Sequence, residues 1–281
     1  MTLCVVGLVV LDGWLDGTLS RTTSDDNAVK GTIFCVLTAV VVIAAQLELS
    51  HLAGLKNLKV FLPLTIPGAV LFGTSWYWPQ FGGFSRADYV LCLTIVMFFG
   101  FLLYQYTCCG TEGVIANCGA NVFCVIYLGL LGSFLGLIRI EFGLWALLMV
   151  VFVVKCADIG AYAIGSMFGR HKFSPGISPG KTWEGMGGAA AAAVIVAIAF
   201  AEVFDIMAWW LAVIFGVCFA FFGQLGDLAE SMLKRDAERK DSANSVPGFG
   251  GILDVVDSLL VSAPLCYVFF RAACSSNFCR F

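Results

Sequence analysis

Long hydrophobic runs separated by short polar segments make up most of the chain. Each run approaches the roughly 20 apolar residues that a helix needs to cross a bilayer. The alternation of polar and apolar residues required by a closed transmembrane barrel is absent, so we expect an all-α, polytopic helical membrane bundle. Eight spans are predicted, at about residues 31–48, 61–78, 89–106, 114–138, 143–165, 185–204, 208–222 and 256–272.

The first fifteen residues do not fit this scheme. They are apolar but short, they contain Asp12, and they lack the basic start of a signal peptide. A re-entrant segment and a truncated start both remain open. We therefore expect about 8–9 transmembrane helices in a single membrane domain, residues 1–281, with N-terminal spans in 1–142 and a catalytic half in 143–281.

Composition supports the membrane assignment. Hydrophobic residues make up 60% of the chain and the mean hydropathy is +0.92, which excludes an ordinary soluble domain. Many of the 12 cysteines lie within the predicted spans, where a thiol acts as a small hydrophobic group. The formal net charge is −3, and we expect no nucleic acid among the partners.

Two basic loops indicate the orientation. One contains Arg170, Lys172 and Lys181, and the other contains Lys234 and Arg235. Two predicted spans separate them, so both loops lie on one side of the membrane. Because Lys and Arg concentrate in cytoplasmic loops, we expect that side to be cytoplasmic.

The polar run from residue 224 to residue 257 is the strongest candidate for chemistry, with seven acids and four bases in 34 residues. If 226–239 is helical, Asp227, Glu230, Ser231 and Lys234 share one stripe. Acids are the hard oxygen ligands that Mg²⁺ prefers, and Lys234 and Arg235 can hold phosphate oxygens. The alternative is a solvated amphipathic helix with internal ion pairs.

A glycine-rich loop follows this stripe. Gly250 and Gly251 would let backbone amides approach an anion. The loop leads directly to Asp254 and Asp257, which lie three residues apart at the start of the last span. Together with Asp227 these carboxylates form a plausible site for one or two metal ions.

The first basic loop carries a second set of candidates. Lys155 and Asp158 lie three residues apart inside a span, where they either mark a substrate path or neutralise each other. Ser178 or Thr182 could cap the helix that follows. The free amides of that helix beside Lys181 would equally form an anion site, with Glu184 close by.

These blocks resemble the signature of the phosphatidate cytidylyltransferases, also called CDP-diacylglycerol synthases. The later block is matched by Ser231, Lys234, Arg235, Lys240, Asp241, Pro247, Gly248, Gly250, Gly251, Asp254 and Asp257. The earlier blocks are matched by Lys155, Asp158, Ala161, Tyr162, Gly165, Phe168, Gly169, Ser178, Pro179, Lys181, Thr182, Glu184 and Gly185. Phe249 and Val255 depart from the family, which often has His and Arg at these positions.

The resemblance implies transfer of a cytidylyl group from CTP to phosphatidate, forming CDP-diacylglycerol and pyrophosphate with Mg²⁺. The expected metal ligands are Asp227, Asp254 and Asp257, and catalysis is expected to use Asp227, Asp254, Lys234 and Arg235. The expected substrate-binding residues are Ser178, Lys181, Thr182, Glu184, Ser231, Lys240, Asp241, Gly250 and Gly251. The bilayer is an expected partner, and a homodimer and location in a bacterial inner membrane are further expectations.

Two other functions stay open. A CTP-dependent polyprenol or dolichol kinase would transfer the γ-phosphoryl group to an alcohol and release CDP. A membrane transporter would also place Lys155 and Asp158 inside the bilayer. The transporter would not need a Lys-Arg pair and a glycine-rich loop on the same side of the membrane.

Overall fold

The computed structural model describes residues 2–15, 30–83, 85–239 and 251–275, and these are almost entirely helical. The chain forms two compact units. One unit comprises Met1–Ile140 with Ala237–Val255, and the other comprises Glu141–Asp236 with Val256–Phe281. Helix α10, Leu253–Ser275, begins in the first unit and continues in the second.

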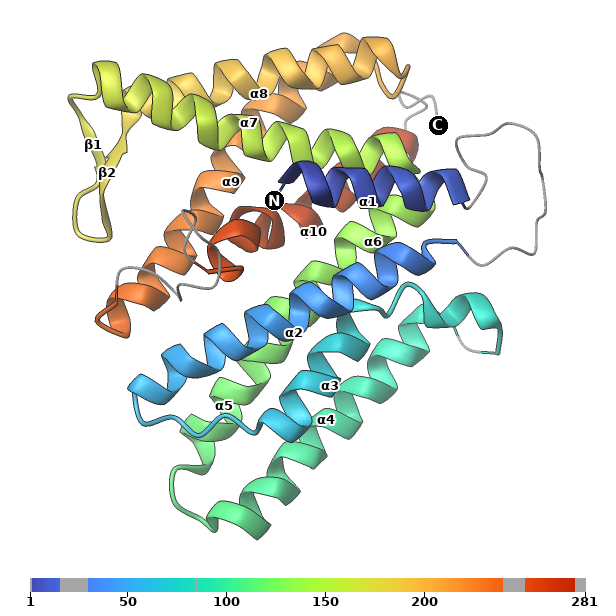
Figure 1. Ribbon diagram of the computed structural model, residues 1–281, viewed down its shortest axis with the longest axis vertical. Coiled ribbons are helices and arrows are strands. Elements are labelled where there is room, and N and C mark those ends of the chain that lie inside the picture. The colour runs from blue at the N-terminus through green and yellow to red at the C-terminus, as the bar shows by residue number, and fades with distance from the viewer. Residues whose placement is uncertain (1, 16–29, 84, 240–250, 276–281) are drawn as a thin grey trace. The chain divides into compact units, whose positions relative to one another are not determined.

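The first unit is built from the N-terminal helices (Figure 1). In chain order these are α1 (Thr2–Leu15), α2 (Thr32–Leu55), α3 (Leu62–Gly73), the 3₁₀-helix η1 (Trp78–Phe81), α4 (Arg86–Cys109), α5 (Val114–Cys124), the π-helical η2 (Val125–Leu130) and α6 (Leu131–Glu141). Helices α5, η2 and α6 run on without a break, so residues 114–141 form one long apolar helix.

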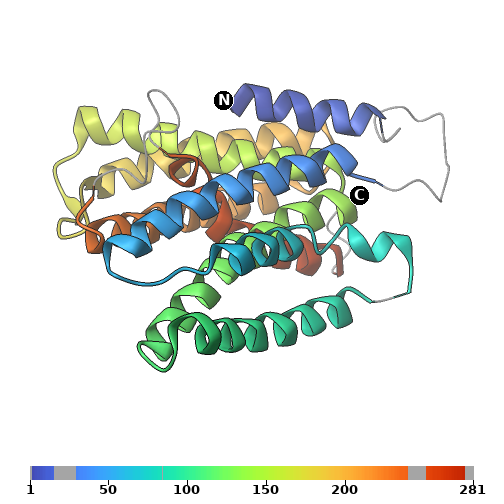
Figure 2. The ribbon, with the colours of Figure 1, turned by 60° about the horizontal axis from the view of Figure 1, so that its bottom comes forward.

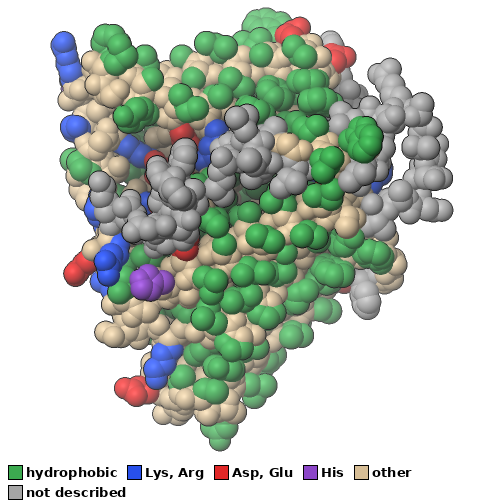
Figure 3. Space-filling model, in the orientation of Figure 1, with side chains coloured by type: hydrophobic (Ala, Val, Ile, Leu, Met, Phe, Trp, Pro, Cys, Tyr) green, Lys and Arg blue, Asp and Glu red, His purple; other side chains and the backbone are tan. Residues whose placement is uncertain are grey.

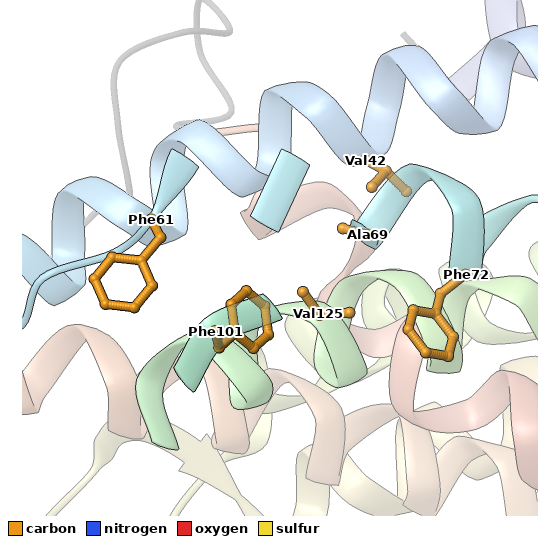
Figure 4. Close-up of a cluster of buried hydrophobic side chains, with 6 residues drawn as sticks. All are labelled: Val42, Phe61, Ala69, Phe72, Phe101 and Val125. Carbon is orange, nitrogen blue, oxygen red and sulfur yellow. The ribbon is translucent and has the colours of Figure 1, made fainter. Parts of the chain in front are cut away.

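Large and small apolar side chains from α2, α3, α4 and η2 meet in the core of this unit. Figure 4 shows that cluster, which consists of Val42, Phe61, Ala69, Phe72, Phe101 and Val125. Close packing of this kind depends on small residues between large ones. Ala69 is fully buried, and a Cβ at Gly129 would lie 2.6 Å from its carbonyl oxygen.

Helix α1 is tied to the first unit by a buried carboxylate. Asp12 accepts hydrogen bonds from the backbone N–H groups of Ile33, at 2.9 Å, and Phe34, at 3.2 Å, and so caps the start of α2. Its other oxygen lies 3.5 Å from Nη2 of Arg139, and both side chains are 1% exposed. Asp12, which made the first segment ambiguous in sequence, thus lies on a helix of 14 residues, α1, and caps the next helix, α2.

The second predicted span is shorter than expected. Helix α3 has 12 residues and ends at Gly73. The indole N–H of Trp76 donates to the Gly73 carbonyl at 3.0 Å, and the backbone N–H of Tyr77 donates to the Thr74 carbonyl at 2.9 Å. The Trp76 side chain thus occupies the Gly73 carbonyl, which the Tyr77 N–H would need in a longer helix. Hydrophobicity alone could not reveal this stop.

The second unit contains a hairpin set between long helices. Its elements are α7 (Leu144–Phe168), β1 (Lys172–Ser174), β2 (Ser178–Thr182), α8 (Trp183–Val203), α9 (Trp209–Asp236) and the larger part of α10. Helices α7 and α8 run side by side, with the hairpin at one end of the pair (Figure 1). They can approach this closely because Gly160 has no side chain. A Cβ at that position would lie only 2.6 Å from the Gly188 carbonyl oxygen.

Among the described residues, seven helices are long and apolar enough to cross a membrane: α2, α4, residues 114–141, α7, α8, α9 and α10. Helix α4 lies at the outer side of its unit in Figure 2, and only 6% of the residues in its 18-residue apolar stretch are buried. Hydrophobic side chains cover the surface in this region (Figure 3). The prediction of an all-α, multi-pass membrane protein is confirmed.

Candidate active site

A cluster of three carboxylates lies in the second unit. Asp227 and Glu230 come from α9 and Asp257 from α10, and one oxygen of each lies within 4.8 Å of the others. Glu230 and Asp257 are buried, with 1% and 3% exposure. Like charges held this close repel strongly unless cations neutralise them. The donor set contains only hard oxygen ligands and fits a divalent cation such as Mg²⁺.

Two lysines neutralise part of this charge. The ammonium of Lys181 lies 2.7 Å from Asp227 Oδ2, and that of Lys234 lies 2.9 Å from Glu230 Oε2. Both lysine side chains are largely buried, at 13% and 12% exposure. Cations and carboxylates therefore alternate over a small area, as they would where a metal ion and phosphate groups are bound together.

A glycine allows α9 and α10 to meet at the cluster. A Cβ at Gly226 would lie 2.8 Å from both the carbonyl oxygen of Asp257 and the Cα of Ser258. The backbones at this point are too close for any side chain. Gly226 thus brings Asp227 within reach of Asp257.

A polar network extends the site toward α7. Lys155 Nζ lies 3.4 Å from Asp158 Oδ2 and 2.9 Å from the hydroxyl of Ser258. Ser258 also donates to Asp158, at 3.3 Å, and the side-chain amide of Gln224 donates to the other Asp158 oxygen, at 3.1 Å. Lys155 and Asp158 do pair, but within a network that joins three helices rather than as an isolated pair.

The β-hairpin presents Lys181 to the cluster. Strands β1 and β2 pair antiparallel, with Lys172 opposite Thr182 and Ser174 opposite Ser178. The Thr182 hydroxyl then accepts a hydrogen bond from the Gly185 N–H at 3.1 Å and caps α8. Of the two predicted caps, the structure gives this role to Thr182.

Glu184 lies in the first turn of α8 but holds the chain just before the hairpin. Its carboxylate accepts hydrogen bonds from the backbone N–H groups of Arg170 and His171 at 3.2 Å, and it lies 2.6 Å from Nδ1 of His171. These contacts order the segment between α7 and β1. Its predicted role in substrate binding stays a prediction.

A cavity of about 310 Å³ lies beside Lys181 and is also lined by the carboxylates of Asp158 and Asp227. Its lining combines charged groups with hydroxyls and aromatic rings, and includes Asp158, Tyr162, Phe173, Ser178, Lys181 and Asp227. This volume lies in the usual range for a small-molecule site. Most of the lining comes from the first basic loop and the helices at either side of it, as the sequence indicated.

The other predicted site residues have varied positions. Ser231 is partly buried on α9, and the exposed Arg235 donates to the Ile177 carbonyl, at 3.3 Å. Asp254, in the first unit, accepts a hydrogen bond from the Gly251 N–H at 2.6 Å. Lys240, Asp241 and Gly250 lie outside the described residues, as does Phe249.

Three polar residues of the site were not singled out as functional by sequence. Glu230 was placed on the polar stripe but not among the metal ligands, although its spacing of three from Asp227 was the available signal. Gln224 lies three residues before Asp227 on α9, and Ser258 directly follows Asp257 on α10. A polar side chain one turn from an intramembrane acid was the only hint of their role.

The fold and this cluster define a multi-pass membrane protein with three close carboxylates that could hold a divalent cation. The sequence model of the cytidylyltransferase family matches residues 27–273, and the chain belongs to that family. It is thus a nucleotidyltransferase of the membrane.

Individual relatives agree with this assignment. The phosphatidate cytidylyltransferase of Bacillus subtilis, strain 168, is 33% identical over 232 residues, which is 79% of this chain and 84% of the relative. That of Staphylococcus saprophyticus is 37% identical over 218 residues, covering 76% and 83%. That of Mycobacterium bovis is 31% identical over 214 residues, covering 74% and 70%.

Proposed function

We propose that this protein is a phosphatidate cytidylyltransferase, which transfers a cytidylyl group from CTP to phosphatidate and forms CDP-diacylglycerol and pyrophosphate. The observation that carries the proposal is the cluster of Asp227, Glu230 and Asp257 with Lys181 and Lys234 bonded to two of its members. Membership of the cytidylyltransferase family and the names of the relatives support the choice of reaction.

The reaction needs charge neutralisation more than covalent help. An oxygen of the phosphatidate phosphate forms a bond to the α-phosphorus of CTP, and the bond from that phosphorus to the β-phosphate bridging oxygen breaks, with pyrophosphate leaving. A phosphate monoester dianion is already a nucleophile, so no protein base is required. Lys181, Lys234 and Arg235 bind phosphate oxygens and balance the charge that accumulates during transfer.

Mg²⁺ is the proposed cofactor. Asp227, Glu230 and Asp257 would hold it, since they offer close carboxylate oxygens and no sulfur or imidazole ligand. When bound, the ion would neutralise phosphate oxygens and orient the triphosphate. Asp254 as a further ligand, and a second metal ion, stay predictions from the sequence.

The membrane surface explains the location of the site. The headgroup of phosphatidate would reach the cavity from the bilayer while its acyl chains stay among the lipids, and CTP would enter from water. Lys172 precedes α8 and Lys234 lies at the end of α9, so both lie on one side of the membrane, which the positive-inside rule makes cytoplasmic. The bacterial relatives support a location in a bacterial cell membrane, which is the inner membrane where there are two.

The position of the label from CTP tests this function directly. Purified protein in detergent is incubated with phosphatidate and Mg²⁺, using CTP labelled at either the α- or the γ-phosphorus. Cytidylyl transfer puts the α-label in lipid and the γ-label in pyrophosphate. A lipid kinase acting on an added polyprenol would put the γ-label in lipid and the α-label in CDP. If CTP stays intact with both acceptors, the enzymatic proposal is wrong.

A further inference from the structure

Asp158 is a carboxylate of the second unit to which the proposed reaction gives no role. It lies on α7, lines the cavity of about 310 Å³ together with Lys181 and Asp227, and its side chain is 32% exposed. Among the described residues, the candidate metal cluster comprises Asp227, Glu230 and Asp257, and Asp158 stands outside it. Its place in the cavity therefore needs an explanation other than the metal ion.

The two oxygens of this carboxylate have different surroundings. Oδ2 lies 3.4 Å from Lys155 Nζ and accepts a hydrogen bond from the Ser258 hydroxyl at 3.3 Å. Oδ1 accepts one from the side-chain amide of Gln224 at 3.1 Å. Of these three described partners, Gln224 lines the cavity, whereas Lys155 and Ser258 do not. Oδ1 is therefore the oxygen that faces the cavity, and Oδ2 is turned away from it.

The same network fixes the carboxylate and balances its charge. The ammonium of Lys155 offsets the negative charge of Asp158, which weakens its repulsion of phosphate groups in the cavity. An ionised carboxylate only accepts hydrogen bonds, at about four sites, and the three described donors leave Oδ1 able to accept another. Asp158 thus presents a fixed acceptor to a molecule in the cavity.

The proposed substrates differ in what they offer to an acceptor. The phosphate of phosphatidate is a dianion and its other two glycerol hydroxyls are esterified, so its headgroup has no N–H or O–H group to donate. The triphosphate of CTP also only accepts. The donors are the amino group of cytosine and the hydroxyls of ribose. A fixed acceptor in the cavity therefore fits the nucleoside of CTP rather than the lipid.

An aromatic ring in the same lining favours the base over the sugar. Phe173 on β1 lines the cavity, and its ring is held edge-on by Trp183, with the centroids 4.7 Å apart and an interplanar angle of 87°. Nucleobases stack on such rings, and ribose does not. A carboxylate that accepts a hydrogen bond from the cytosine amino group is a known pairing in base recognition.

We infer that Asp158 is a specificity-determining residue: its Oδ1 accepts a hydrogen bond from the amino group of cytosine and so selects CTP over UTP. Uracil has a carbonyl oxygen at that position, and two acceptors would then face each other with no proton between them. A pairing of this kind typically discriminates between bases by about 10- to 100-fold. The inference rests on the proposed function, since it concerns the nucleotide of that reaction.

Asp158→Asn tests the inference, because it reverses the chemistry of this position at nearly constant size. Lys155 and Ser258 both donate at the Oδ2 position, so the amide oxygen takes that place. The NH₂ group then takes the place of Oδ1, where Gln224 can accept one of its hydrogens through its own amide oxygen. The other hydrogen faces the cavity, where it suits the uracil carbonyl and not the cytosine amino group.

The measurement is phosphatidate-dependent pyrophosphate release by the purified full chain in detergent with Mg²⁺ and with CTP, UTP or 2′-deoxy-CTP. We expect the ratio of kcat/KM for CTP to that for UTP to be at least about tenfold lower in Asp158→Asn than in wild type. The ratio for CTP to 2′-deoxy-CTP should stay unchanged, because the substitution alters a contact to the base and not to the sugar.

Glu141→Gln is the matched control. Glu141 is another acid of the second unit that a side chain holds, since its two oxygens accept from the Tyr267 hydroxyl at 3.0 and 2.8 Å. It is not one of the described residues that line the cavity. Its ratio of CTP to UTP use should match that of wild type.

Four results would overturn the inference. They are equal use of CTP and UTP by wild type, an unchanged ratio in Asp158→Asn, an equal fall in Glu141→Gln, and a change in Asp158→Asn that appears only between CTP and 2′-deoxy-CTP. If Asp158→Asn folds but is inactive, the same comparison is made from the protection that each nucleotide gives against thermal unfolding.

A second variant covers the case in which Asp158→Asn does not fold. Gln224→Met removes the donor that orients Oδ1 and leaves the carboxylate in place. It should also lower the ratio of CTP to UTP use, and an unchanged ratio would again overturn the inference. If wild-type protein releases no pyrophosphate from any of the three nucleotides, the proposed function itself fails. Pyrophosphate release with a wild-type ratio in the variants leaves that function standing and removes only the role of Asp158.

Discussion

Lys181 and Asp227 form an ion pair of 2.7 Å between the β-hairpin and α9, and the same ammonium donates to the Gln224 carbonyl at 2.9 Å. The lysine side chain is 13% exposed and lines the cavity of the second unit. A cation is thus held ready at the edge of the carboxylate cluster. There it can exchange a carboxylate for a phosphate oxygen when substrate binds.

Replacing Lys181 by Ala should lower kcat for pyrophosphate release about 100-fold, since removing one preorganised group that stabilises developing negative charge typically costs 10²–10³. The control is Lys172→Ala, an exposed lysine on the other strand of the same hairpin. Its rate should match wild type. A normal rate in Lys181→Ala would exclude this lysine from the reaction.

Two serines of α10 allow the contribution of hydrogen bonds to stability to be compared with that of burial alone. Ser258 and Ser262 are both fully buried, one turn apart. Ser258 bonds Lys155 and Asp158, whereas the Ser262 hydroxyl has no hydrogen-bond partner among the described residues. Ser258→Ala should lower the free energy of unfolding by about 1–3 kcal/mol, because it leaves buried polar groups unsatisfied.

Ser262→Ala removes a buried hydroxyl that has no partner among the described residues, so it should leave that free energy unchanged or raise it. Both values can be measured by thermal or denaturant unfolding of purified protein in detergent. Equal effects of the two substitutions would mean that the hydrogen bonds of Ser258 contribute nothing to stability.

The approach of α9 to α10 should be sensitive to one methyl group. Gly226→Ala places a Cβ 2.8 Å from the Asp257 carbonyl oxygen, and such overpacking costs about 1–3 kcal/mol. The helices must separate at the carboxylate cluster, so both Tm and kcat should fall. Gly187→Ala on α8, where nothing lies within 4 Å of the added carbon, should leave kcat unchanged.

Removal of divalent cations should abolish activity reversibly. Without a cation, the carboxylates of Asp227, Glu230 and Asp257 repel the phosphates of both substrates. We expect EDTA-treated protein to release no pyrophosphate and Mg²⁺ to restore the wild-type rate. Activity that persists after complete chelation would show that the cluster is not a metal site.

Much of the fold could be predicted from hydrophobic runs, because length and apolarity suffice to identify a spanning helix. The prediction failed where side chains decide the outcome. The 61–78 segment is mostly apolar, but the Trp76 side chain takes the Gly73 carbonyl, which a continuing helix would need for the Tyr77 N–H. Arg139 is buried against Asp12, 127 residues earlier in the chain, a pairing that the hydrophobic pattern does not reveal.

The candidate site shows the same division. Spacing along a helix placed Asp227 and Glu230 on one stripe, and the residue types indicated metal and phosphate. The partner of Lys181 could not be deduced, since it depends on how the hairpin is placed beside α9.

The most direct test is phosphatidate-dependent pyrophosphate release by wild type and by Asp227→Asn, which removes one charge from the cluster at constant volume. Glu202→Gln, an exposed acid at the far end of α8, is the control. We predict release by wild type and the control only when phosphatidate, CTP and Mg²⁺ are all present, and a loss of at least about 100-fold in Asp227→Asn. Wild-type release by Asp227→Asn would contradict the assignment of the carboxylate cluster as the active site.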